Sequence, residues 1–149
     1  WHLSLAGFGG DEAVILKEAE GLPNVSWHGR IPYQKTLELT AASDVSIATY
    51  DPAIANHRYA SPNKIFEAMM LAKPVVVARG TQMDEIINTW ECGLTVRYGN
   101  LRELEESLEI LAEDPDFRET LGKNGRRAYQ ESYSWDTMRD RLLALYGKL

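Results

Sequence analysis

Lys64 and Glu67 are the polar residues whose spacing best suits binding chemistry in this chain. They lie three positions apart in a segment with helical periodicity, and a 100° wheel places them together on one face while the apolar residues share the other. A base and a carboxylate on an exposed helix face can hold an anion and accept hydrogen bonds from neutral hydroxyl groups. The segment around these two residues is therefore the first candidate for a site.

The start of that helix adds to the same chemistry. Ser61 suits the N-cap and Pro62 suits the first helical position. The free amides of the first turn, with Asn63 and Lys64 beside them and the positive end of the helix dipole, form a candidate phosphate site. Glu67, one turn further along, is placed to accept hydrogen bonds from ribose hydroxyls. An amphipathic helix with a Lys64/Glu67 surface pair explains the same spacing, so both interpretations remain open.

Alternating strand and helix patterns position these residues. The helix ends before Pro74, and residues 75–78 read as a strand buried on both faces. The alternation of strand and helix patterns predicts an α/β fold, with an open parallel sheet flanked by helices and right-handed crossovers. The other strands are expected at 1–6, 25–28, 45–48 and 94–96, and the other helices at 11–20, 33–42, 84–89, 101–113, 115–131 and 134–145. Asn100 and Ser134 are expected to cap the helices at 101–113 and 134–145, and the acidic residues 103, 105, 106 and 109 are expected to form a solvated face.

Two glycines end the first expected strand. Gly9 and Gly10 let a backbone approach a ligand closely, as glycine has no Cβ. The pattern lacks the full G-x-G-x-x-G spacing of a dinucleotide site. A ligand-facing loop and an ordinary tight turn therefore both fit this pair.

Two further loops follow the strands at 45–48 and 75–78. Ligands of open α/β sheets bind at the carboxyl ends of the strands, so both loops are candidates for binding. The first, residues 49–60, includes His57 and Arg58, for which a solvated loop position is the alternative to a ligand contact. The second runs from Arg79 to Met83 and is expected to lie beside the Ser61 cap.

Composition limits the class of protein. The chain has 149 residues, 44% of them apolar and 26% charged, and this fits one globular domain without a membrane span. A formal charge of −6 argues against a nucleic-acid-binding surface. Cys92 is the single cysteine, so an internal disulfide is excluded, and the three histidines lack ligand spacing. We predict no metal site and assign no catalytic residue.

The order of landmarks resembles the C-terminal half of retaining glycosyltransferases of the GT-B architecture, the type called glycosyl transferases group 1. The resemblance covers nearly the whole chain. Its carriers are short segments at strand ends and helix starts: 5–10, 24–29, 42–45, Ser61-Pro62-Asn63-Lys64 with Phe66-Glu67-Ala68-Met69, 73–76, 85–87 and 133–135.

The resemblance implies a Rossmann-like lobe that binds a nucleotide-diphosphate sugar. A second lobe, N-terminal in the family and absent from residues 1–149, would bind the acceptor and complete the transfer with retention. Lys64 and the helix start would hold the diphosphate, and Glu67 matches the glutamate that bonds the nucleotide ribose. Loops bordering the nucleotide and the transferred sugar would contribute further residues, namely Gly9, Gly10, Tyr50, Arg79, Gly80, Thr81 and Gln82.

The chain departs from the family pattern at two places. Tyr59 stands eight residues before Glu67, where the family often has its first glutamate. Thr81-Gln82 replaces a pair that is often Gly-Gly. Contacts to the donor sugar are therefore not carried over from the family, although a subgroup with a Ser-Pro-Asn-Lys stretch is similar here.

The expected function is transfer of a sugar from a UDP- or GDP-sugar in glycan biosynthesis. The acceptor would be a glycan, a lipid-linked molecule or a small molecule. No cofactor is expected, because Lys64 and the helix start would supply the charge of a divalent ion. A cytoplasmic location is expected, with peripheral membrane attachment through the other lobe. Two alternatives stay open: a non-enzymatic flavodoxin-like interaction module and one lobe of a sugar-nucleotide epimerase.

Overall fold

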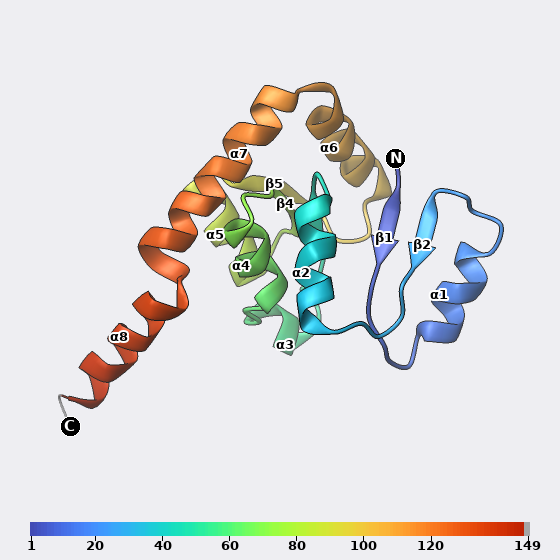
Figure 1. Cartoon of the computed structure of the whole chain (residues 1–149). Coiled ribbons are helices and arrows are strands. Elements are labelled where there is room, and N and C mark those ends of the chain that lie inside the picture. The colour runs from blue at the N-terminus through green and yellow to red at the C-terminus, as the bar shows by residue number, and fades with distance from the viewer. Residues whose placement is uncertain (148–149) are drawn as a thin grey trace. The chain divides into compact units, whose positions relative to one another are not determined.

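A computed structural model describes residues 1–147 and divides the chain into two compact units, Trp1–Ala42 and Ser43–Leu149 (Figure 1). Each unit contains parallel strands joined by helices. This is the α/β arrangement that the alternation of strand and helix patterns predicts. Within the described residues, the strands hydrogen-bond as one pair in the first unit and one three-stranded sheet in the second.

The first unit is a strand-helix-strand-helix segment. Leu3 lies opposite Val25 and Leu5 lies opposite Trp27 in its parallel pair. A parallel pair needs a crossover connection, which the first helix supplies. The elements are β1 (Leu3–Leu5), α1 (Glu12–Ala19), β2 (Val25–Trp27) and α2 (Tyr33–Ala42).

The second unit is built on a parallel sheet with the strand order β3-β4-β5. Ala48 lies opposite Val77, and Ala78 lies opposite Val96, so the carboxyl ends of the three strands reach one edge. Its strands are β3 (Ser46–Ala48), β4 (Val75–Ala78) and β5 (Gly93–Val96), and its helices are α3 (Ala55–Arg58), α4 (Asn63–Met70), α5 (Gln82–Trp90), α6 (Leu101–Glu113), α7 (Pro115–Ala128), the π-helix η1 (Tyr129–Tyr133) and α8 (Trp135–Tyr146).

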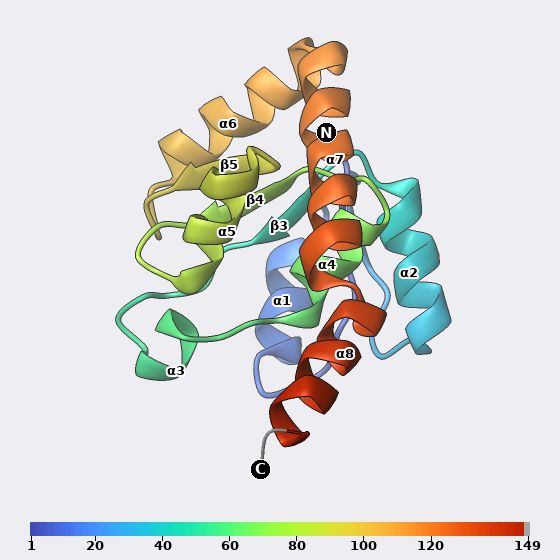
Figure 2. The same cartoon turned by 90° about the vertical axis from the view of Figure 1, so that its left-hand side faces the viewer.

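Strand β4 lies at the centre of the core. All four of its residues are fully buried, as the sequence predicts for 75–78. Val75 and Val77 belong to an apolar cluster with α4 and α5, while Val76 packs in a second cluster with Val96 and with Leu111 of α6. Figure 2 shows α4 and α6 on opposite sides of the strands. Helices on both faces thus remove the central strand from water.

Several helix boundaries differ from the sequence-based expectation. The helix expected at 62–73 ends at Met70, because Ala72 turns the chain with a left-handed φ of 55°. Helix α5 begins at Gln82, so the loop after β4 is shorter than predicted. The irregular stretch at 49–60 contains the one-turn helix α3. The helix caps expected at Asn100 and Ser134 are confirmed, and each side chain accepts a backbone N–H.

The chain leaves α7 through the π-helix η1. This turn places Tyr133 against two aromatic rings, with centroids 5.3 Å from Phe66 and 6.4 Å from Trp90. Helix α8 then continues beyond η1 and ends the described chain (Figure 1). Through residue 147, the helices lack the combination of length and apolar character that crossing a bilayer requires.

Gly122 of α7 provides a test of this packing. A Cβ built at Gly122 would lie 2.2 Å from the carbonyl oxygen of Ala72, whereas one at Gly125 would meet its neighbours at 3.5 Å. We expect Gly122→Ala to lower the free energy of unfolding by about 3 kcal/mol, because backbone must move. The matched variant Gly125→Ala should be neutral or stabilising by up to ~1 kcal/mol, since alanine favours helix. Urea unfolding measures both, and equal effects would contradict the close approach.

Cys92 provides a second test. Its side chain is fully buried, and burial raises the pKa of the thiol to about 11. Only the thiolate attacks disulfide reagents. We expect the native chain at pH 8 to resist an aromatic disulfide reagent, while the chain unfolded in guanidinium reacts at its single thiol. Rapid labelling of the native chain would show that α5 and α7 do not cover this residue.

Candidate functional site

The carboxyl edge of the β3-β4-β5 sheet gathers the loops that the sequence singles out. Thr49 follows β3, Arg79 follows β4 and Arg97 follows β5. The first two loops touch, because a Cβ at Gly80 would lie 3.4 Å from the side chain of Pro52. Parallel pairing in register explains this arrangement, since it aligns the ends of neighbouring strands.

The N-terminus of α4 follows the loop after β3. Pro62 has an extended ψ of 137°, and the helix begins at Asn63 without a side-chain cap. The expected N-cap Ser61 is therefore wrong by one position, because Pro62 rather than Ser61 is the last non-helical residue. The first amides of a helix have no intrahelical acceptor. This end of α4 thus presents N–H groups and the positive end of the helix dipole.

Lys64 lies beside an aromatic pair at this edge. Its ammonium nitrogen is 5.6 Å from the ring centroid of Tyr50, a cation–π distance. The ring of Tyr50 in turn meets the edge of His57, with centroids 5.2 Å apart and planes at 78°. The structure therefore brings together Tyr50 and Lys64, which the sequence analysis placed 14 positions apart in separate elements.

His57 carries an unpaired polar atom within this group. Its Nδ1 is buried and has no hydrogen-bond partner among the described residues. The exposed ammonium of Lys64 and the half-buried ring of Tyr50 lie at the same edge. The group thus offers an anion an exposed positive charge next to an aromatic surface.

Glu67 and Asn63 lie on the face of α4 away from the core. Asn63 is exposed and Glu67 is half-buried, while Ile65, Ala68 and Met69 are buried. The predicted division of the helix into a packed face and a polar face is confirmed. A carboxylate one turn into the helix can accept two hydrogen bonds from adjacent hydroxyls, because ionised carboxylates have only acceptor oxygens.

The loop after β4 is held by its own hydrogen bonds. Gly80 donates its N–H to Asp84 Oδ2 at 2.8 Å, and the hydroxyl of Thr81 donates to the carbonyl of Ala78 at 3.0 Å. Thr81 is buried, and Gln82 is exposed in the first turn of α5. The Thr81 hydroxyl is therefore used within the loop, and Gly80 and Gln82 are the exposed positions left as candidate ligand contacts.

The guanidinium of Arg79 is engaged in hydrogen bonds within the domain, which the sequence alone does not indicate. Its Nη2 donates to Glu103 Oε2 at 2.7 Å and to the carbonyl of Thr95 at 3.2 Å. Two of the guanidinium nitrogens, Nε and Nη2, are thus directed toward β5 and α6. The guanidinium is partly neutralised, so an anion at this edge would find less charge than Arg79 alone implies.

Glu103 is a residue that sequence reasoning placed wrongly, on a solvated acidic face of α6. Its side chain is only 19% exposed and accepts bonds from the backbone N–H of Arg97 at 2.8 Å and from the Arg97 Nε at 2.5 Å. The signal was present in the sequence. Asn100 caps α6, and Glu103 stands at the third helical position, where a carboxylate often reaches back toward the cap.

Gly9 and Gly10 lie in the first unit, after β1. Both are exposed, and a Cβ at either would meet no atom within 4 Å. Close by, the guanidinium of Arg30 lies 4.5 Å from the ring centroid of Phe8. The glycine loop is therefore open within its own unit, as a ligand-facing turn requires.

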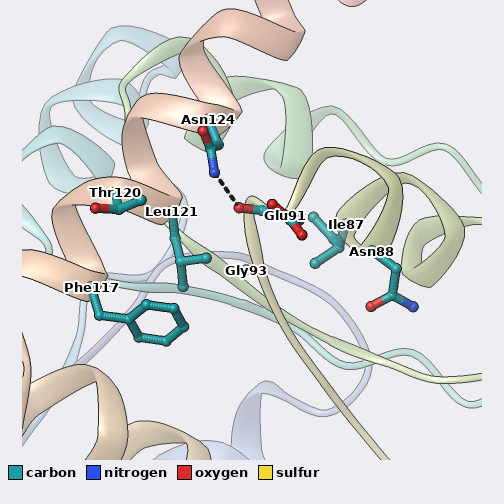
Figure 3. A pocket seen from close by; sticks show the side chains of 8 residues that line it. All are labelled: Ile87, Asn88, Glu91, Gly93, Phe117, Thr120, Leu121 and Asn124. Carbon is teal, nitrogen blue, oxygen red and sulfur yellow. Dashed lines mark hydrogen bonds between the residues drawn. The ribbon is translucent and has the colours of Figure 1, made fainter.

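A cavity of about 440 Å³ lies away from this edge (Figure 3). It adjoins Gly93 at the amino end of β5, whereas the loops above follow the carboxyl ends. Asn124 closes one side by donating its amide N–H to the carbonyl of Glu91 at 2.9 Å. Because of this position, the cavity plays no part in the candidate site. Separately, no group of three or more metal-ligating side chains occurs within residues 1–147.

The family comparison covers most of the chain. The model of the family described as Glycosyl transferases group 1 matches residues 1–114. The match includes β1 to β5, the Gly9-Gly10 loop and the whole of α4.

Curated relatives are similar over different lengths. The capsular polysaccharide biosynthesis glycosyltransferase CapM of Staphylococcus aureus is 30% identical over 91 residues, which are 61% of this chain and 24% of the relative. A GDP-mannose-dependent monoacylated alpha-(1-6)-phosphatidylinositol monomannoside mannosyltransferase of Corynebacterium glutamicum is 27% identical over 143 residues, which are 95% and 37%. The chain therefore spans well under half the length of these relatives.

Solved structures show the same fold. Sucrose-phosphate synthase from Thermosynechococcus elongatus has a TM-score of 0.81 at 22% identity, over 99% of this chain and 38% of that one. The Anabaena protein HepE in complex with UDP-glucose has a TM-score of 0.80 at 22% identity, over 99% and 41%. The predicted α/β Rossmann-like architecture of a GT-B glycosyltransferase domain is thus confirmed.

The ion pairs of Glu103 generate a prediction for the pH dependence of stability. The N–H of Arg97, and then its guanidinium, hold the pKa of Glu103 below its ordinary value of 4.5. A lowered pKa in the folded state stabilises the fold above the ordinary value, and this stabilisation is lost as the pH falls through the folded value. We expect Glu103→Gln to be less stable than the parent at pH 7, with the difference shrinking below pH 4.5.

Urea unfolding of the parent and the variant at pH 7 and at about pH 3 measures this difference. Glu106→Gln is the matched control, because Glu106 lies on the same helix in an exposed pair with Arg102. Exposed i,i+4 pairs contribute only a few tenths of a kcal/mol. A gap between parent and Glu103→Gln that is the same at both pH values would contradict the assigned ion pairs.

Proposed function

The chain belongs to the glycosyl transferases group 1 family, and on this basis we propose that it binds the nucleotide-sugar donor of a retaining glycosyltransferase. The observation that carries the proposal is the N-terminus of α4 with Lys64 at the carboxyl edge of the sheet. Helix N-termini at this edge bind phosphate groups in many α/β proteins. The relatives named above act as glycosyltransferases, which supports the same reaction class.

The diphosphate of the donor binds at the start of α4. The amides of Asn63 and Lys64 point out of the first turn, and Ser61 and Pro62 lead into it. The Lys64 ammonium, now over Tyr50, reaches a phosphate by a change of side-chain rotamer. These groups supply positive charge where the departing nucleotide diphosphate develops negative charge, so they stabilise the transition state electrostatically.

The nucleoside and the sugar bind on either side of the diphosphate. Glu67, half-buried one turn along α4, accepts hydrogen bonds from the ribose hydroxyls. The loop from Arg79 to Gln82, in which Gly80 and Gln82 are exposed, borders the transferred sugar. In the first unit, Gly9 and Gly10 stay predicted donor contacts, because their loop is exposed and carries no side chain.

The base and the sugar differ among the similar proteins. HepE was solved with UDP-glucose, and the relative from Corynebacterium glutamicum is named for GDP-mannose. This chain therefore binds a UDP- or GDP-sugar, and a direct titration with both nucleotides distinguishes them. The acceptor is bound by a further lobe, as expected for a domain that spans about two fifths of its structural neighbours. This domain alone is expected to bind the donor and scarcely turn over.

Calorimetric titration with UDP and GDP tests the proposal. We expect one nucleotide to bind with a Kd between micromolar and millimolar, and EDTA to leave the affinity unchanged because Lys64 and α4 neutralise the diphosphate. Lys64→Ala should weaken binding about 10-fold or more, since a charge-assisted hydrogen bond contributes ~1.5–3 kcal/mol. Glu67→Ala should weaken it about 10-fold through the loss of ribose contacts.

Lys123→Ala is the control for the loss of a lysine, because Lys123 is an exposed residue of α7 paired with Glu119. It should bind the nucleotide like the parent. Failure of both nucleotides to bind a folded parent chain would overturn the donor site. If Lys64→Ala and Lys123→Ala weaken nucleotide binding equally, the affinity depends only on the net charge of the chain and not on Lys64 at the start of α4.

A further inference from the structure

Glu103 joins three segments at the carboxyl edge of the sheet. It accepts from the Arg79 guanidinium after β4, from the backbone and side chain of Arg97 after β5, and from the Asn100 amide at the start of α6. The Arg79 and Arg97 guanidiniums make two ion pairs with one carboxylate, at 2.7 and 2.5 Å. Charge-assisted hydrogen bonds of this kind are about twice as strong as neutral ones.

Glu103 attaches the loop after β4 to α6. The backbone of Gly80 is tied to Asp84 of α5, and Thr81 is tied back to Ala78 of β4. Arg79 is tied sideways, to the Thr95 carbonyl of β5 and to Glu103 of α6. Removing the Glu103 charge would leave Arg79 attached to β5 only, through its backbone N–H to the Val96 carbonyl and its guanidinium to the Thr95 carbonyl. The loop would then lose its attachment to α6.

We propose that Glu103 is a positioning residue of the donor site, which holds Arg79 so that the loop from Arg79 to Thr81 keeps the geometry that recognises the transferred sugar. The proposal rests on the proposed function, because it takes this loop to border the sugar. Glu103 itself contacts no substrate. Its effect is therefore expected on the contribution of the sugar to binding and not on the nucleotide.

Glu103 also affects the positive charge at the carboxyl edge of the sheet. Glu103 partly neutralises the guanidiniums of Arg79 and Arg97 at an edge where a diphosphate is to bind. A neutral residue at position 103 would leave both guanidiniums available to any nearby anion. The affinity for the free nucleotide should therefore be kept or raised in such a variant, while the added affinity from the sugar is lost.

The test compares the affinities for UDP and UDP-glucose, and for GDP and GDP-mannose, in the parent chain, in Glu103→Gln and in Glu106→Gln. We analyse the pair whose nucleotide binds the parent chain. For this pair, we expect Glu103→Gln to lower the affinity for the sugar nucleotide about 5-fold relative to the affinity for the free nucleotide. The matched control Glu106→Gln should keep the parent ratio. Arg79→Gln should reproduce the change in ratio, and the double variant should add little to it, because the two residues act as one unit.

If the folded variant Glu103→Gln keeps the parent ratio between the affinities for the sugar nucleotide and the free nucleotide, the positioning role is overturned. Circular dichroism checks the fold of each variant. Should the parent bind no nucleotide, the proposed donor site fails, and hydrogen exchange of the Gly80 amide then decides the role of Glu103. Exchange about 10-fold faster in Glu103→Gln than in Glu106→Gln would support a loop-holding role, and equal rates would overturn it.

Discussion

The burial of β4 is the constraint on which the second unit depends. The strand is hydrogen-bonded to β3 on one side and to β5 on the other, and helices exclude water from both of its faces. A buried peptide group without a hydrogen bond costs several kcal/mol in an apolar medium, so the strand must keep both neighbours in register. That register is what brings the ends of β3, β4 and β5 to one edge, and hence brings together the loops that form the candidate site.

The candidate site combines a loop held by hydrogen bonds with an exposed lysine. The loop after β4 is fixed by hydrogen bonds from Gly80 and Thr81 and by the Glu103 ion pairs, whereas Lys64 is exposed and rests on the ring of Tyr50. Such a division suits the binding of a nucleotide sugar. In the function proposed above, a loop of defined shape borders the sugar, while the long side chain of Lys64 reaches the diphosphate on which charge develops.

Much of the fold followed from local sequence patterns. The four apolar residues at 75–78 predicted a doubly buried strand, and Asn100 and Ser134 predicted helix starts that the structure confirms. Local patterns failed where backbone geometry depends on distant contacts. The carbonyl of Ala72 lies against α7 at Gly122, and the left-handed turn there ends the preceding helix earlier than its periodicity suggests. Pro62, not Ser61, precedes the helix, since Pro62 has an extended ψ of 137°.

The family resemblance, the α/β order of elements and the polar face of α4 could all be predicted from the sequence, because they depend on residue type and on spacing along one element. Contacts between residues of separate elements could be identified only from the tertiary structure. Lys64 reaches Tyr50, and Glu103 reaches Arg79 across 24 positions, because strand pairing aligns the ends of separate elements. Sequence spacing carries no information on such contacts. The position of Glu103 after Asn100 indicates a contact with its own helix cap, but its ion pairs with two guanidiniums form only because the sheet brings the ends of β4 and β5 beside α6.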